Sequence, residues 1–318
     1  MVATVKSSPN STAERDLHLR LARFNTQRLC PSLPRADWRD ALVAEFALRG
    51  LEAEFLEGER LRAIPLAREA PREPKAFVAW FEALERNGPG QHDSLFAYLA
   101  EKATREEMRW FLTQEIAGEA GFDDLVALTQ VKMPTLAKLE LARNFWDEMG
   151  RGQARNMHGA LLDRVSQALE LTPLLEETAW EPLALANLLT GLAANRSYAY
   201  HAIGGLGVVE LTAPGRVALV NEGLKRLGLD ANARQYFVLH ATLDVKHSQD
   251  WNREILTSLV AECPEYAQPI AEGAIMRLQA GARCYSLYRR ELGVETMDGA
   301  DGLLRGLYMR RVARPATV

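Results

Sequence analysis

Hydrophobic residues recur along the chain mostly at the three- and four-residue spacing of an amphipathic helix. Leu17, Leu21 and Phe24 follow this spacing, and another such run begins at Trp38. The strict alternation of apolar and polar residues that is typical of a strand is nearly absent. The pattern therefore predicts an all-α protein.

Proline- and glycine-containing stretches divide this pattern, because proline lacks a backbone donor and glycine readily adopts turn conformations. These stretches lie at residues 31–34, 65–74, 88–90 and at Pro134. The helices predicted between them span residues 13–29, 36–60, 75–86, 93–101, 104–129, 134–148, 153–170, 179–201, 215–227, 232–262 and 268–291.

The same pattern predicts three parts along the chain. Residues 1–12 are expected to form a disordered tail, and residues 13–70 an N-terminal helical arm. The charged segment 54–74, which contains three prolines, would link this arm to a helical bundle formed by residues 71–318.

Composition excludes several classes of partner and compartment. The 38 basic and 42 acidic residues give a net charge of −4, which indicates neither a nucleic-acid partner nor a membrane surface. The three cysteines are odd in number and widely spaced, as is usual in a reducing compartment. Charges interrupt every apolar run before it reaches the roughly 18 residues that a membrane span requires. We therefore expect a soluble, cytoplasmic protein.

The segment from His240 to His247 carries the strongest chemical signal. No proline or glycine occurs between Gln235 and Glu262, so one continuous helix is expected there. At about 100° per residue, His240, Asp244 and His247 fall within an arc of about 60° on one helix face. Two imidazoles and one carboxylate on one face form a donor set that suits iron, manganese or zinc.

Two further segments contain candidate ligands. Glu148 and His158 are ten residues apart, and on an unbroken helix their side chains would diverge by about 80°. They can share a site only if Gly150 and Gly152 break the helix between them. Glu210 is an isolated acid among small and apolar residues, where it either faces water or binds a cation, because burying an uncompensated carboxylate is costly.

Taken in order, these residues resemble the ligand pattern of the haem-oxygenase-like diiron oxidases, also described as iron-containing redox enzymes. In that family one helical region supplies a Glu and a downstream His, a second supplies a Glu, and a third supplies His-x3-Asp-x2-His. The resemblance covers roughly residues 104–290 and implies a haem-oxygenase-like helical bundle. It also implies a metal site formed by Glu148, His158, Glu210, His240, Asp244 and His247.

The resemblance further implies two Fe(II) ions as cofactors and dioxygen as co-substrate. Six protein ligands cannot fill both coordination shells, so open positions for dioxygen and substrate are expected. The expected partner is a small organic molecule such as an amino acid, an amine or a fatty acid. The reaction would be C–C cleavage, hydrogen abstraction or N-hydroxylation. An external electron donor and a homodimer are further expectations, whereas nucleic acid and membrane are not expected partners.

Residues considered as pocket lining are Trp110, Phe111, Glu115, Glu119, Tyr198, Tyr200 and His201. The like-charged pair Glu115 and Glu119, spaced i and i+4, is read as a solvated stripe in preference to a handle for an amine or an extra iron ligand. Tyr285 and Tyr288 are expected to fill the bundle.

Three alternatives stay open at this point. The first is a metal-independent enzyme of the thiaminase or cofactor-maturation type, in which Glu148 and Glu210 act as acid and base. The second is a non-catalytic helical protein that uses residues 13–70 as its contact surface. The third is haem binding, for which only His18 is available near the start of the chain.

Overall fold

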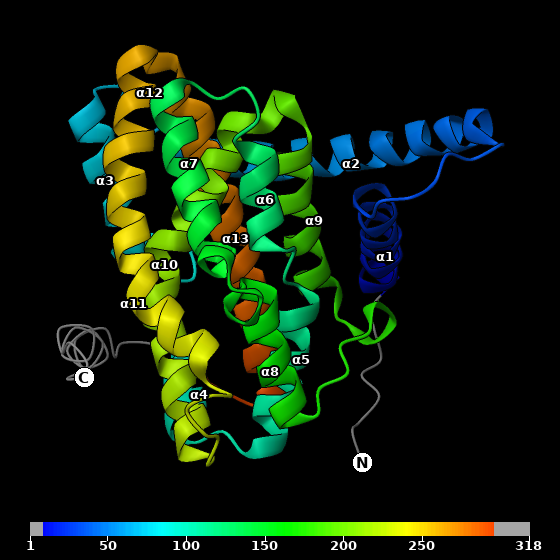
Figure 1. Ribbon diagram of the computed structural model, residues 1–318, viewed down its shortest axis with the longest axis vertical. Coiled ribbons are helices and arrows are strands. Elements are labelled where there is room, and N and C mark those ends of the chain that lie inside the picture. The colour runs from blue at the N-terminus through cyan, green and yellow to red at the C-terminus, as the bar shows by residue number, and fades with distance from the viewer. Residues whose placement is uncertain (1–8, 296–318) are drawn as a thin grey trace.

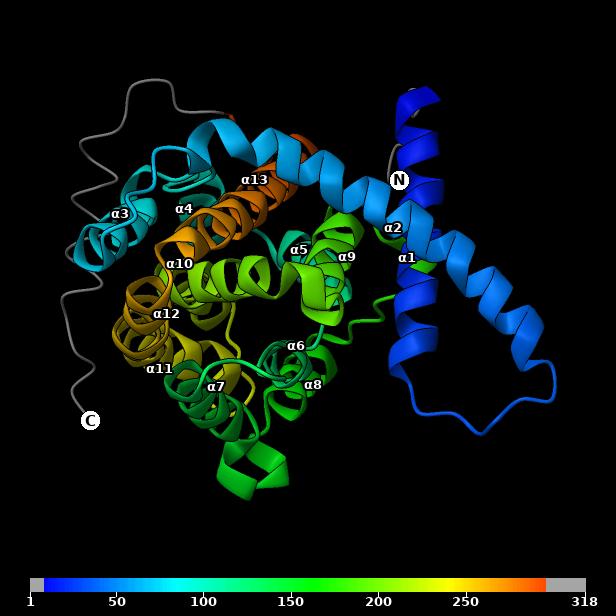
Figure 2. The ribbon, with the colours of Figure 1, turned by 90° about the horizontal axis from the view of Figure 1, so that it is seen from above.

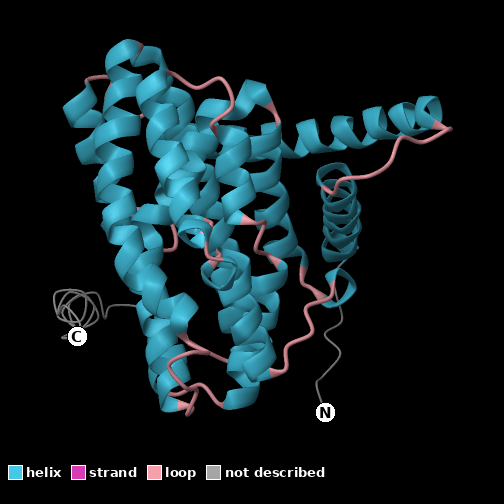
Figure 3. Cartoon of the chain, viewed as in Figure 1, coloured by secondary structure: helices cyan, strands magenta, loops and turns pink. Residues whose placement is uncertain are grey.

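The structure, a computed structural model, describes residues 9–295, and within that range every regular element is a helix (Figure 3). The all-α prediction is confirmed. Residues 1–8 of the predicted tail lie outside the described part of the chain, and the first helix begins at Pro9.

The helices of the arm are α1 (Pro9–Leu29) and α2 (Trp38–Ala67) (Figure 1). The remaining α-helices are α3 (Pro74–Asn87), α4 (Ser94–Glu101), α5 (Arg105–Ala117), α6 (Phe122–Thr129), α7 (Thr135–Glu148), α8 (His158–Leu169), α9 (Trp180–Ala194), α10 (Ala199–Arg226), α11 (Gln235–Asp250), α12 (Thr257–Glu262) and α13 (Ala267–Leu292). A π-helical segment, Trp251–Leu256, joins α11 to α12 without a break.

Helix α10 is the central helix of the bundle. Seen from above, α13, α9, α6, α7 and α11 surround it (Figure 2). Its sequence explains this position, because it is apolar or small on nearly all sides and carries its charges mainly in the last turns. A ligand on α10 is therefore held in the interior of the protein.

Glycines let α10 and α13 approach each other closely where they cross. A Cβ atom on Gly204 would lie 1.8 Å from the carbonyl oxygen of Ile270, and one on Gly273 would lie 1.9 Å from that of His201. These two glycines thus allow α10 and α13 to pack closely.

Several predicted boundaries were wrong, including that of the helix predicted over residues 179–201, which is interrupted between α9 and α10. Residues 202–214 were not predicted to be helical, but α10 runs through Pro214, because burial on all sides outweighs the one hydrogen bond that proline removes. Helix α2 likewise continues past Pro65 to Ala67. By contrast, the single helix predicted over residues 104–129 is two helices, since the chain turns at Gly121, whose φ is +73°.

The arm packs on the bundle through part of its length. His18 of α1 is 1% exposed and lies against Phe55 and Trp180. Near the end of α2, Glu59 accepts a hydrogen bond from Arg283 of α13. The first half of α2 projects away from the bundle and leaves apolar side chains such as Phe46 in solvent (Figure 2).

One helical stretch, Arg196–Arg226, is apolar and long enough to cross a membrane by length and composition. In the bundle 61% of its most apolar window is buried. Its hydrophobicity is accounted for by its central position, which agrees with a soluble protein.

The close crossing of α10 and α13 predicts that Gly204→Ala destabilises the protein by about 2 kcal/mol or more, because the new methyl group meets backbone rather than a flexible side chain. Gly50→Ala is the matched control, since nothing lies within 4 Å of that position in α2. The control should stabilise the helix by roughly 0.5–1 kcal/mol. Urea denaturation of both variants measures the difference, and equal effects would contradict the crossing.

Burial, with a smaller effect of the Arg283 charge, lowers the pKa of His18 from 6.5 to about 4. Below pH 6.5 the unfolded chain then binds a proton that the folded protein does not, so stability falls as the pH drops from 6.5 to 4. The loss should reach roughly 3 kcal/mol. Urea denaturation of the wild type and His18→Phe at pH 7.5 and pH 4.5 should show that the variant lacks this part of the pH dependence.

Candidate metal centre

Four helices bring the six predicted ligands together inside the bundle. Glu148 is the last residue of α7, His158 is the first residue of α8, and Glu210 lies in the middle of α10. Helix α11 supplies His240, Asp244 and His247. All six residues are at most 8% exposed. The structure thus gathers side chains that lie up to a hundred positions apart in the sequence.

The helix breaks between Glu148 and His158, as sharing one site requires. Helix α7 ends at Glu148, and the chain then passes through Gly150, Arg151 and Gly152, all with positive φ. A Cβ on Gly150 would lie 2.6 Å from the backbone of Asn156, so only glycine fits there. In Figure 1, α7 and α8 lie one above the other with this break at mid-height. The break brings His158 Nδ1 to 2.7 Å from Glu148 Oε2.

The ligand atoms form two groups that share one carboxylate. One group contains Glu148, His158 and His240, and the other contains Glu148, Asp244 and His247. Within each group the candidate ligand atoms lie within 4.8 Å of one another. Glu148 also stands at the C-terminal end of α7, where the helix dipole favours a cation. The two groups share Glu148, and each could hold a metal ion.

Glu210 joins the second group from the central helix. Its Oε2 lies 3.5 Å from His247 Nδ1, and its Oε1 accepts a 2.6 Å hydrogen bond from Asn144 Nδ2 on α7. The approach of α10 to the π-helical segment that follows α11 depends on Gly207, where a Cβ would lie 2.4 Å from the Trp251 indole nitrogen. A small residue one turn before Glu210 therefore lets its carboxylate reach α11.

Asp147 orients His247 and was not identified from the sequence. Its Oδ2 lies 3.2 Å from His247 Nε2, while Arg151 donates a 2.6 Å hydrogen bond to its Oδ1. This contact turns His247 Nδ1 inward, where it is buried and makes no hydrogen bond with any described residue. One ring nitrogen held by a carboxylate, and a buried second nitrogen that faces Glu210 and Glu148 without a hydrogen bond, form an arrangement that suits a metal-ligating histidine. The residues present therefore fit a metal ion at this point.

The proton affinities of the cluster reflect acids and imidazoles packed together in an apolar interior. Burial, together with the charge of Asp244, raises the pKa of Glu210 to about 7. Burial alone would lower the pKa of His247, but Glu210 and Asp147 raise it to about 10. The ionised form of each group is stabilised by a neighbouring group of opposite charge. Divalent cations bound to the carboxylates would provide the positive charge directly.

Glu119 and Tyr236 border the first group. Glu119 Oε1 lies 3.6 Å from His158 Nε2, and Glu119 also accepts hydrogen bonds from the backbone N–H groups of Gly121 and Phe122. The Tyr236 hydroxyl lies 3.5 Å from the same nitrogen of His158. The preferred reading of Glu115 and Glu119 as a solvated stripe was wrong, since both side chains line the cavity that reaches the cluster. The turn at Gly121, which aims Glu119 at His158, is not evident from the i and i+4 spacing.

The cavity has a volume of about 190 Å³ and reaches the cluster. Glu148, His158, Glu210, His240 and Asp244 form part of its wall, and most of the remainder is apolar. Among the residues considered as lining, Phe111, Glu115 and Glu119 contribute, whereas Trp110, Tyr198, Tyr200 and His201 do not. Tyr285, which was expected to fill the bundle, also lines it. His18 is buried between α1, α2 and α9 outside the cavity, and so it is not placed as a haem ligand.

The sequence pattern of one protein family, described as iron-containing redox enzyme, matches residues 109–282, more than half of the chain. The chain belongs to this family. No curated protein sequence matches it. The matched range contains all six cluster residues and the whole of α10.

Solved structures support the fold of the chain. Two crystal structures of a CADD-like protein of unknown function from Nostoc punctiforme are 16% identical to the chain, with TM-scores of 0.54 and 0.52. The two alignments cover 67% and 70% of this chain. They cover 95% and 96% of the chains in the crystal structures. At this identity the likeness shows the all-helical fold alone.

The shared position of Glu148 predicts unequal effects of ligand substitutions on metal binding. Glu148→Ala should weaken both positions, whereas His158→Ala removes a ligand from one group only and should leave about one tightly bound ion per chain. Anaerobic Fe(II) titration followed by metal analysis measures the stoichiometry. His201→Asn, a buried histidine outside the cluster, is the control and should bind as the wild type does. Equal losses for the two ligand variants would contradict a shared carboxylate.

Proposed function

We propose that the protein is a non-haem diiron oxidase or oxygenase that uses dioxygen to oxidise a small organic substrate. The observation that carries this proposal is the pair of three-residue ligand groups sharing Glu148 in the wall of a cavity. Membership of the iron-containing redox enzymes makes iron the expected metal. A hydrolytic zinc site is disfavoured by that membership, because zinc has no redox chemistry.

Two ferrous ions bound here would supply electrons and open coordination positions for the reduction of dioxygen. Glu148, His158 and His240 would hold one ion, and Glu148, Asp244, His247 and Glu210 the other. Six protein ligands leave both ions incompletely coordinated, which is the requirement for dioxygen and substrate to approach.

The surrounding residues keep the ligands in place before any ion binds. Asp147 fixes the ring of His247 through its Nε2, and Asn144 fixes the carboxylate of Glu210. Such contacts cut the cost of ordering the ligands when a metal arrives. The apolar wall, which includes Phe111 and Phe122, limits the water that can reach the site.

The cavity volume of about 190 Å³ is below the roughly 300–1,000 Å³ of pockets for drug-sized ligands, which supports a small substrate. The cytoplasmic location, the external electron donor and the homodimer stay predictions. We further propose that the protein acts without a nucleic-acid or membrane partner. The net charge of −4 does not favour nucleic acid, and the apolar helix α10 is mostly buried in the bundle.

Oxygen uptake tests the proposal directly. The protein is loaded anaerobically with two equivalents of Fe(II), mixed with dioxygen, and supplied with a panel of amino acids, alkylamines and alkanoic acids. One class should accelerate oxygen consumption and yield an oxidised product by mass spectrometry. Glu148→Ala should abolish both effects, and His201→Asn should retain them. A protein that binds no iron would end the proposal.

A metal-independent enzyme with Glu148 and Glu210 as acid and base is the second candidate, favoured by the raised pKa of Glu210, which burial brings to about 7. It predicts full activity in excess chelator. The oxygen-uptake measurement repeated with chelator separates the two candidates. A non-catalytic role would leave every measured function intact in His240→Ala.

A further inference from the structure

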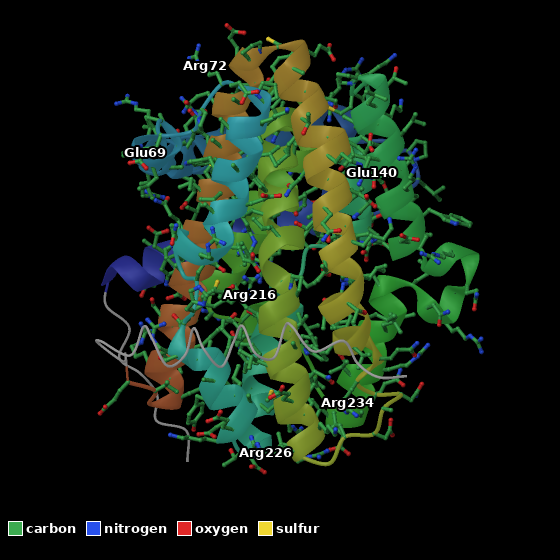
Figure 4. All side chains as sticks on the ribbon, turned by 90° about the vertical axis from the view of Figure 1, so that its left-hand side faces the viewer. Glu69, Arg72, Glu140, Arg216, Arg226 and Arg234 are labelled. Carbon is green, nitrogen blue, oxygen red and sulfur yellow. The ribbon has the colours of Figure 1, made fainter. Side chains whose placement is uncertain are left out.

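Two arginines face the cavity that contains the metal centre. Arg216 lies on α10, six residues beyond Glu210, and Arg277 lies on α13. Both line the cavity that Glu210 also lines. Figure 4 shows Arg216 near the middle of α10. Six residues along an α-helix correspond to about 9 Å, so Arg216 is separated from the metal ligands by roughly the length of a small molecule.

Neither guanidinium has a hydrogen-bonding partner within residues 9–295. Arg216 makes only a cation–π contact with the ring of Tyr285, at 5.8 Å from its centroid. Arg277 makes no hydrogen bond or ion pair there, and its Nε is buried without a partner. Most other buried or half-buried arginines of the bundle are paired, as Arg283 is with Glu59. A buried polar group without a partner is costly, so these two positions are suited to a ligand that satisfies them.

Glu115 does not neutralise the pair. Its Oε1 accepts a 2.8 Å hydrogen bond from the Tyr288 hydroxyl, and it reaches the two arginines only through longer-range attraction. Burial raises the pKa of Glu115, while Tyr288 and the two arginines act in the opposite direction. Two guanidinium groups against one carboxylate leave this end of the cavity with an excess positive charge even when Glu115 is ionised. One further negative charge would balance it.

Gly281 makes room for the guanidinium of Arg277. A Cβ at Gly281 would lie 2.5 Å from Arg277 Nη1 and 3.4 Å from the Tyr285 hydroxyl. The guanidinium therefore lies over this glycine, one turn along its own helix, beside a second polar group. Any side chain at position 281 would displace it.

We infer that Arg216 and Arg277 bind the carboxylate of a small monocarboxylic substrate whose apolar remainder extends through the cavity toward the metal centre. The planar guanidinium matches a carboxylate with two parallel hydrogen bonds. Most of the other lining side chains, including Ile116 and Ala213, are apolar and suit a hydrocarbon body. Arg216 and Arg277 exceed Glu115 by one positive charge, which a monocarboxylate would neutralise. A zwitterion would bring an additional ammonium charge and leave the excess uncompensated, so a monoacid is favoured.

This inference deepens the proposed function and rests on it for the identity of the cavity as a substrate site. Its test does not need iron. Hexanoate, hexan-1-ol, hexylamine and norleucine are titrated calorimetrically into the full-length, chelator-treated protein. Hexanoate should bind more tightly than the other three. Arg277→Gln and Arg216→Gln should each weaken hexanoate by about tenfold or more, because each removes a charge-assisted contact, and should leave hexan-1-ol unchanged.

Arg290→Gln is the matched control, because Arg290 lies on the same helix, loses the same charge and is 62% exposed outside the cavity. It should bind hexanoate as the wild type does. Gly281→Ala should reproduce a part of the Arg277→Gln loss, since it moves the guanidinium without removing it. Circular dichroism of every variant checks the fold, and Arg216→Gln serves as the test if Arg277→Gln does not fold.

Hexanoate that fails to bind the wild type, or that binds both arginine variants unchanged, would overturn the inference. Tighter binding of norleucine than of hexanoate would also overturn it, in favour of an amino-acid substrate. The Fe(II) titration is independent of these results. Iron binding without hexanoate binding would refute the carboxylate site alone, and hexanoate binding without iron binding would refute the diiron proposal alone.

Discussion

Three carboxylates that face one another in an apolar interior are the constraint on which this structure depends. Glu148, Glu210 and Asp244 are each at most 4% exposed, and three imidazoles are the nearest groups that can carry opposite charge. Burying so many ionisable groups is unfavourable unless a cation or a proton compensates them. The helix break after Glu148, the contact of Asp147 with His247 and the close approach of α10 at Gly207 all serve to bring these groups together. Membership of the iron-containing redox enzymes makes iron the cation expected to compensate them.

The two ends of the cavity differ in chemistry. Its metal-facing wall contains the ligands, and its other end contains Arg216 and Arg277 among apolar side chains. A molecule held by its charged end would place its hydrocarbon part toward the cluster, so binding energy remote from the reaction would orient the atom to be oxidised. The central helix contributes to both ends, with Glu210 and Arg216 fixed on one rigid element.

The arm has a different physical basis. Its first helix is anchored by a neutral, buried His18 between Phe55 and Trp180, whereas the first half of α2 leaves large apolar side chains in solvent. The family match begins at residue 109, beyond the arm, and covers the part of the chain that carries the cluster.

The sequence by itself determined the helical class, the shared face of His240, Asp244 and His247, and the need for a break between Glu148 and His158. These follow from the 3.6-residue period and from glycine conformation, which are local properties. It did not determine that α10 runs through Pro214, because the burial that outweighs a missing hydrogen bond comes from surrounding helices. The role of Asp147, the contact of Glu119 with His158 and the two cavity arginines were likewise assigned only by the tertiary structure. Their roles depend on which side chains from distant segments they meet, and a spacing along one helix carries no such information.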